Sequence, residues 1–110
     1  ASFYLVQAAY ERLAAGGLEE EERRNVTNRA FERLQALDAL DPHGDFPPRH
    51  LYRALLNETL FRRTGHEDAR QAALRAYDRY VARVGAGGTV DEATQANLEM
   101  ARRRRAELGR

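Results

Sequence analysis

The chain has 110 residues, enough for one domain, and 43% of them are hydrophobic while 32% are charged. Its 18 basic side chains nearly balance 17 acidic ones, so the composition excludes a disordered chain, which has few apolar residues and a large net charge. No run approaches the roughly 18 apolar residues that span a bilayer, so we expect no membrane segment. The absence of cysteine excludes disulfide scaffolds, thiol catalysis and cysteine-based zinc sites.

All 18 basic residues are arginine, and lysine and isoleucine are absent. We interpret this bias as that of a GC-rich, bacterial genome. The first residues show no charged segment followed by an apolar run, so we expect no signal peptide and a cytoplasmic protein. Alanine, leucine, arginine and glutamate are strong helix formers and β-branched residues are sparse, which predicts an all-α fold.

Two helices are expected in the first 40 residues. Residues 2–15 place apolar side chains at helical spacing, and a Gly-Gly pair ends this segment. Residues 18–40 begin with acidic side chains, which the helix dipole favours, and end at an Asp-Pro pair, because the residue before a proline is pushed out of the helical region. The buried face of this second helix is predicted to consist of Val26, Ala30, Leu34 and Leu37.

A third helix is expected over residues 47–63, with Asp45 as its cap and two prolines in its first turn. Its apolar residues cover most of its circumference, which places this helix at the centre of the fold. Gly65 separates it from a fourth helix over residues 66–84, whose alanine-rich stripe permits close packing of a neighbouring helix.

The fifth helix is predicted to begin with a capping box formed by Thr89 and Glu92. Short connections imply antiparallel neighbours, so the predicted fold is a stack of antiparallel helical hairpins, five helices in all, with a C-terminal capping helix. We expect residues 1–110 to form a single helical-repeat domain of a longer chain. The weaker apolar stripe of the fifth helix consists of Val90, Ala93, Met100, Ala101 and Leu108.

Two sequence segments resemble the tetratricopeptide-repeat family. The segment AFERLQALDALDP, at residues 30–42, is similar to the end of such a repeat, and RRTGHEDARQAALRAYDRY, at residues 62–80, supplies a glycine turn followed by alanine and aromatic positions. The resemblance covers about four fifths of the chain, although the second helices are longer than the 34-residue register allows. It implies a tetratricopeptide-like solenoid that acts in protein binding.

A narrower resemblance is to the bacterial transcriptional activator domain, a tetratricopeptide-like module found in some bacterial regulators. The segments LQALDALDP, RALL and ALRAYDRY carry it. The sequence departs from that pattern in two places. Gly65 lies farther from ALRAY, and residues 84–88 replace the usual Leu-Gly and Pro before the last helix. The resemblance implies a role in transcription regulation.

No group of residues predicts catalysis. His43, His50 and His66 lack the spacing of a metal site and are expected at the surface or at helix ends. Ser2 is the only serine and stands at the terminus, so a Ser-His-acid triad has no nucleophile. The acidic run at residues 19–22 is expected on a solvated helix start. We therefore expect a chain that is not an enzyme, with no cofactor and no metal.

Helical-hairpin stacks bind partners on the concave surface that the first helix of each pair lines. Here these are the first, third and fifth helices, and the expected partner is a protein, a peptide or a neighbouring domain of the same chain. The candidate partner-binding residues are polar and lie off the apolar stripes of these helices: Gln7, Arg53, Asn57, Asn97 and Arg104.

The run Arg102 to Arg105 is the sharpest charge feature, and on a helix four consecutive side chains fan through about 300°. In one interpretation these cations stabilise the C-terminal end of the last helix. In the alternative, Arg102, Arg103 and Arg105 contact an anion, and the chain is an accessory nucleic-acid-contacting domain of a transcriptional regulator. A third interpretation is homodimerisation through the last helix.

Overall fold

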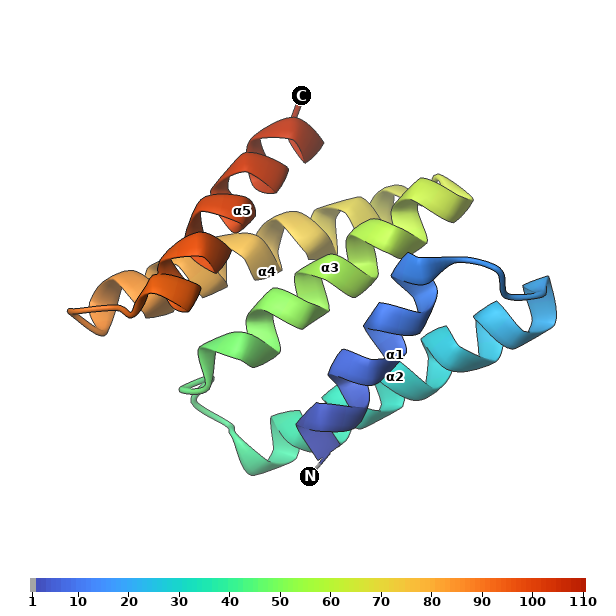
Figure 1. Cartoon of the computed structure of the whole chain (residues 1–110), viewed down its shortest axis with the longest axis horizontal. Helices are drawn as coiled ribbons and strands as arrows, with labels where there is room; N and C mark the ends of the chain where they lie inside the picture. Colours follow the sequence, from blue (N-terminus) through green and yellow to red (C-terminus); the bar gives the residue numbers. More distant parts are fainter. Residues whose placement is uncertain (1) are drawn as a thin grey trace.

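Five helices build the molecule (Figure 1). The computed structural model describes the chain from residue 2 and its side chains from residue 3, and this part of the chain contains no strand. The predicted all-α class and helix order are confirmed. The helices are α1 (Ser2–Ala15), α2 (Glu20–Leu40), α3 (Pro47–Thr64), α4 (Glu67–Ala86) and α5 (Glu92–Leu108).

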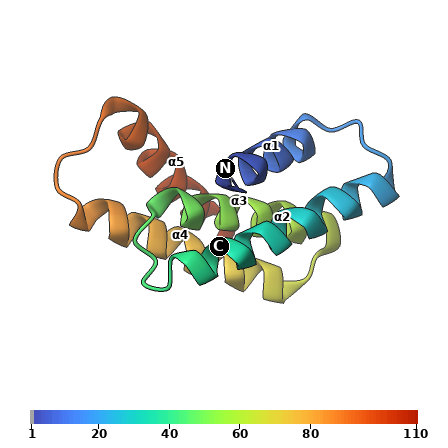
Figure 2. The ribbon, with the colours of Figure 1, turned by 90° about the horizontal axis from the view of Figure 1, so that it is seen from below.

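The helices form two antiparallel hairpins and one final helix (Figure 2). α1 packs against α2, α3 packs against α4, and α5 packs against α4. α3 contacts α1 and α2 as well as α4, so the prediction of a central third helix is confirmed. The first helices of the hairpins and the final helix begin at Ser2, Pro47 and Glu92, so they follow one another at a spacing of 45 residues.

Two apolar clusters hold the hairpins together. The smaller one joins α1, α2 and α3 through Val6, Ala30, Leu34 and Leu56, which are almost fully buried. The larger one joins α3, α4 and α5, where the small side chains of Ala73 and Ala76 let α4 approach its neighbours closely and Tyr77 fills the centre. The predicted stripe of α2 is confirmed at three positions, Val26, Ala30 and Leu34, while Leu37 is half-buried.

The prediction that Asp45 caps α3 is wrong. Phe46 is the N-cap, and no side chain caps the helix. The Asp41 carboxylate instead holds the loop before α3, because it accepts hydrogen bonds from the backbone N–H groups of Asp45 (2.9 Å) and Phe46 (3.2 Å). These bonds favour the charged form and lower the pKa of Asp41. The two prolines occupy the first turn of α3 as predicted, and Asp41 also ends α2.

The predicted capping box of α5 is also wrong. The helix begins at Glu92, and Asp91 is its N-cap, with the side chain accepting a hydrogen bond of 2.7 Å from the backbone N–H of Thr94. Thr89 therefore lies outside the helix. The buried stripe of α5 includes Leu98, which the sequence pattern missed, whereas Ala93 is exposed.

Gly65 ends α3 in the left-handed conformation, with a φ of 75°, as the glycine break predicted. Its backbone N–H closes the helix on the Phe61 carbonyl at 2.6 Å. Among residues 2–110 no helix combines the length and the apolar character of a bilayer span.

Candidate functional site

A groove lies between the first helices of the hairpins and the final helix, on the side where α1 and α5 diverge above α3 (Figure 2). It contains a pocket of about 430 Å³ that residues of α1, α3, α4, α5 and the loop before α5 line together. We call this the α1/α3/α5 groove. Its lining includes Phe3, Gln7, Leu51, Tyr52, Val84 and Asn97.

The floor of the groove is apolar and rigid. Leu51 and Val84 are buried at 3% and 5% exposure, and both belong to the large apolar cluster. Tyr52 meets Phe3 edge to face at a ring separation of 5.5 Å, and Tyr10 at 5.8 Å. Such aromatic pairs stabilise by about 0.5–1.5 kcal/mol beyond their buried area. They fix α1 against α3 and hold the wall of the groove in place.

Two predicted partner-binding residues, Gln7 and Asn97, stand on opposite walls of this groove. Gln7 comes from α1 and Asn97 from α5, and neither side-chain amide has a hydrogen-bond partner among residues 3–110. A side-chain amide presents both a donor and an acceptor. The groove therefore combines an apolar floor with two uncommitted amides.

Three other predicted residues, Arg53, Asn57 and Arg104, are not part of the groove lining. The Nη2 atom of Arg53 donates to both carboxylate oxygens of Asp38 on α2, each at 2.8 Å. Asn57 is 9% exposed, and its Nδ2 donates to the Arg53 carbonyl at 2.9 Å. Because α3 packs on several sides, its polar side chains are used in contacts with neighbouring helices or with its own backbone.

The four consecutive arginines of α5 have different surroundings. Arg102 and Arg103 are exposed, and neither has an ion-pair partner in the described part of the chain. The Nη1 atom of Arg104 lies 3.5 Å from the Tyr10 hydroxyl and thus reaches from α5 to α1. Arg105 pairs with Asp78 on α4 at 2.9 Å. Two of the four side chains are thus engaged in contacts between helices.

A buried polar junction beside the groove was not foreseen from the sequence. Glu58 on α3 is 4% exposed, and its Oε1 accepts a hydrogen bond of 2.6 Å from the hydroxyl of Tyr77, which is fully buried. Its Oε2 accepts a bond of 2.9 Å from Arg62 Nε. Burial, together with this bond to Glu58, raises the pKa of Tyr77. In the sequence, the one indication of this junction was Glu58, a single acidic residue on a largely apolar helix.

His50 lies at a helix end, one of the two positions expected for the histidines, but it is buried. It stands in the first turn of α3 and is only 4% exposed. Its Nε2 lies 3.0 Å from the Gly44 carbonyl. Across residues 3–110, no three His, Asp or Glu side chains come together as metal ligands.

The chain was compared with protein-family models, with curated proteins and with solved structures. A family model would have assigned the fold, and a curated relative would have indicated a partner. None of the three comparisons finds a match to this chain, so the functional argument rests on the geometry of its own residues.

Proposed function

We propose that the chain is a non-enzymatic interaction module of tetratricopeptide type, which binds a peptide segment of a partner or of a neighbouring domain in the α1/α3/α5 groove. The observation that carries the proposal is the pocket of about 430 Å³ with Gln7 and Asn97 on opposite walls. This volume lies within the range of about 300–1,000 Å³ that is typical of ligand pockets.

The lining favours a peptide over a charged ligand. Peptide bonds carry one donor and one acceptor each, which matches the two uncommitted amides. The lining holds one acidic and one basic residue, Asp91 and Arg83, so their charges cancel. Asp91 caps α5, and Arg83 donates to the His43 carbonyl at 2.7 Å. We therefore expect a nearly neutral segment with one large apolar side chain, which the floor at Leu51 and Tyr52 would accept.

The arrangement of helices supports the repeat type. Two antiparallel hairpins and a final helix present α1, α3 and α5 to one groove, as the first helices of a helical-hairpin stack do. The 45-residue spacing is longer than the 34-residue tetratricopeptide period. The proposed setting, a bacterial regulator, is supported by the arginine-only basic composition and by the ALRAYDRY segment of α4.

The test begins with peptides selected from a random phage-displayed library and measured by fluorescence anisotropy. Replacing both Gln7 and Asn97 by alanine is expected to weaken the selected peptide about tenfold, because each hydrogen bond contributes about 0.5–1.5 kcal/mol. Asn28→Ala, an exposed amide on α2, is the matched control and should bind unchanged. Equal affinity of the double variant and the control would refute the groove as the binding site.

The alternative is nucleic-acid contact through the last helix. It is favoured only by Arg102 and Arg103, which are exposed and lack ion-pair partners in the described part of the chain. If both contacted phosphates, their loss would reduce the salt slope of duplex DNA binding by about 2, at roughly 0.9 per contact. We expect no such change when Arg102→Gln and Arg103→Gln are combined. A reduction of that size would favour the nucleic-acid function.

A further inference from the structure

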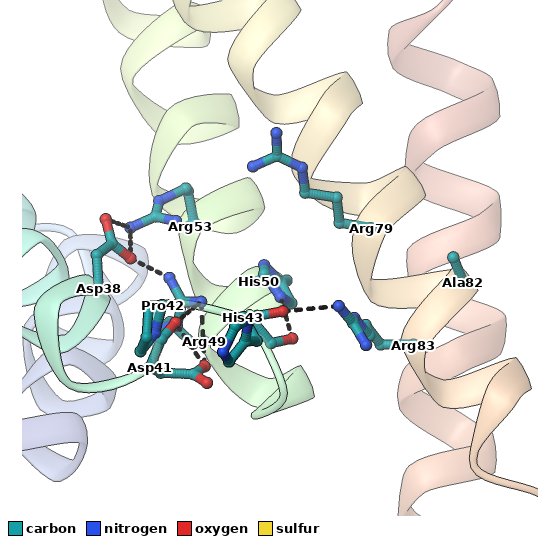
Figure 3. A pocket seen from close by; sticks show the side chains of 11 residues that line it. Asp38, Asp41, Pro42, His43, Arg49, His50, Arg53, Arg79, Ala82 and Arg83 are labelled. Carbon is teal, nitrogen blue, oxygen red and sulfur yellow. Dashed lines mark hydrogen bonds and ion pairs between the residues drawn. The ribbon is translucent and has the colours of Figure 1, made fainter.

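A second pocket, of about 440 Å³, lies where the loop between α2 and α3 meets α4 (Figure 3). We call it the arginine pocket. It is separate from the amides of the groove and shares only Arg83 with the groove lining. Its charged lining residues are Arg49, Arg53, Arg79, Arg83, Asp38 and Asp41.

The two arginines of α3 are held in place by both carboxylates. Arg49 has a 5% exposed side chain, which pairs with Asp38 and with Asp41 at 3.1 Å. Arg53 donates to Asp38 through Nη2 alone, so its Nε and Nη1 have no hydrogen-bond partner among residues 3–110. These ion pairs fix the position of Arg53 but leave some of its N–H groups without an acceptor among residues 3–110. They also occupy both acidic side chains of the pocket.

The two arginines of α4 stand one helical turn apart and extend toward α3 and the loop (Figure 3). Arg79 is exposed and has neither an ion-pair nor a hydrogen-bond partner among residues 3–110. Arg83 donates to the His43 carbonyl, and its pair with Asp45, at 3.4 Å, joins two side chains that are each about half exposed or more. Such a solvent-exposed pair is weak, and an incoming anion competes with it easily.

The imidazole of His50 lies close to the positive charges of this pocket. A carbonyl only accepts, so the contact with Gly44 places the hydrogen on Nε2 and leaves Nδ1 as an acceptor, which is buried without a partner. Burial lowers the pKa of His50 against the effect of the Gly44 bond, and the charges of Arg49, Arg53 and Arg79 lower it further. Guanidinium groups from both α3 and α4 thus act on the same imidazole.

The charge balance selects the class of ligand. Four arginines and two carboxylates give the lining a net charge of about +2, and the one further carboxylate nearby is that of Asp45, in its exposed pair with Arg83. A phosphomonoester carries about −1.5 to −2 at pH 7 and three acceptor oxygens, whereas a carboxylate or a phosphodiester carries only −1. The planar guanidinium matches phosphate geometry with paired hydrogen bonds.

The geometry points to a binding site for a phosphomonoester group, with Arg79 and Arg83 of α4 and the free donors of Arg53 as its ligands. The group belongs either to a small phosphorylated molecule or to a phosphorylated side chain of a partner protein, since both present the same dianion. The site can be tested apart from the proposed peptide groove through Arg79 and Arg53, which do not line that groove, whereas Arg83 lines both.

The experiment titrates the ¹⁵N-labelled chain with phosphoserine, with a Gly-phosphoserine-Gly peptide and with dimethyl phosphate. Saturable shifts of the Gly44 amide and the His50 imidazole are expected with both monoesters, and the diester should bind at least about tenfold more weakly. A bound dianion should also raise the pKa of His50, because it offsets the charges of the three arginines around the ring. Tighter binding of the peptide than of phosphoserine would identify a phosphorylated partner, and equal binding a small molecule.

Two variants on the same helix make the test specific. Arg79→Gln should weaken the monoesters about tenfold or more, since charged hydrogen bonds are the strong ones. Arg75→Gln is the matched control, because Arg75 is exposed one turn earlier on α4 and lies outside the pocket lining. Both substitutions are at exposed positions, so circular dichroism should show an intact fold. Equal weakening by both variants, equal binding of the diester, or tighter binding of duplex DNA than of any monoester would overturn the proposal.

Discussion

Tyr77→Phe removes one hydroxyl group from the centre of the molecule and leaves the rest of the side chain in place. Tyr77 is fully buried, and its hydroxyl donates to Glu58 Oε1 at 2.6 Å. The variant opens no cavity larger than one oxygen atom. It does leave Glu58, which is 4% exposed, with Arg62 as its one remaining side-chain donor. The cost therefore comes from a buried acceptor that has lost its partner.

Hydrogen bonds to charged groups contribute about 1.5–3 kcal/mol, and a buried acceptor without a partner costs a similar amount. We expect the free energy of unfolding to fall by about 2 kcal/mol. With about 2.1 cal/mol/K of unfolding entropy per residue, a chain of 110 residues should lose roughly 9 °C in Tm. Urea unfolding followed by far-UV circular dichroism measures the first quantity, and a thermal scan measures the second.

A second variant separates the hydrogen bond from the loss of the hydroxyl itself. Combining Tyr77→Phe with Glu58→Met replaces both partners by apolar groups, which should restore most of the stability because no buried carboxylate remains. Arg62, at 56% side-chain exposure, stays solvated in this variant. Tyr4→Phe, at a 68% exposed site, is the control and should change stability by less than about 0.5 kcal/mol. If Tyr77→Phe behaved like Tyr4→Phe, or the double variant were less stable than the single one, the reasoning would be refuted.

The same junction predicts a change at alkaline pH. Because the pKa of Tyr77 is raised in the folded chain, its phenol stays protonated where an unfolded tyrosine, with a pKa near 10, loses its proton. The stability that the protonated phenol of Tyr77 contributes is fully present below pH 10 and is lost as the pH rises above 10. The wild type should therefore lose stability above pH 10 more steeply than Tyr77→Phe does.

Other expectations follow from burial and backbone conformation. Because the pKa of His50 is lowered in the folded chain, the unfolded chain binds a proton at higher pH, and stability should fall as the pH drops below about 6.5. His50→Gln should reduce this dependence of stability on pH. Gly65→Ala should cost about 1 kcal/mol because its φ of 75° is left-handed, whereas Gly85→Ala, inside α4 with open space at the Cβ position, should stabilise by about 0.5–1 kcal/mol. Leu98→Ala should cost about 2–4 kcal/mol, since Leu98 is 6% exposed in the larger cluster. Urea unfolding measures each of these differences.

The helices could be predicted because their signals are local. The apolar spacing of a helix and its end depend only on neighbouring residues along about 20 positions of the chain. The structure has the expected helix ends at Asp41 and Gly65. The helix caps could not be predicted in the same way. Asp45 precedes α3 and can accept from backbone N–H groups, but in the structure Phe46 is the N-cap and no side chain caps the helix. The Asp41 carboxylate binds the loop backbone instead.

The residues of the candidate site could be predicted only on helices that have one apolar face and one polar face. Gln7 and Asn97 lie on helices with one apolar face, so their direction follows from helical spacing. Arg53 and Asn57 lie on α3, where apolar residues cover most of the circumference and spacing gives no outward face. The partner of Arg53 is Asp38, 15 residues away on another helix, and no pattern in the sequence pairs the two.

The polar residues of α3 explain how one buried helix supports two separate surfaces. At its start, Arg49 and Arg53 pair with carboxylates of α2 and fix the wall of the arginine pocket. In its last turns, Glu58 joins α4 through Tyr77. Leu51, on the same helix, forms part of the groove floor. Because a buried charge must be paired, Arg49 and Glu58 fix the placement of the elements that supply their partners. The groove and the arginine pocket thus depend on the same helix but on different side chains of it, so substitutions on α3 can alter each without the other.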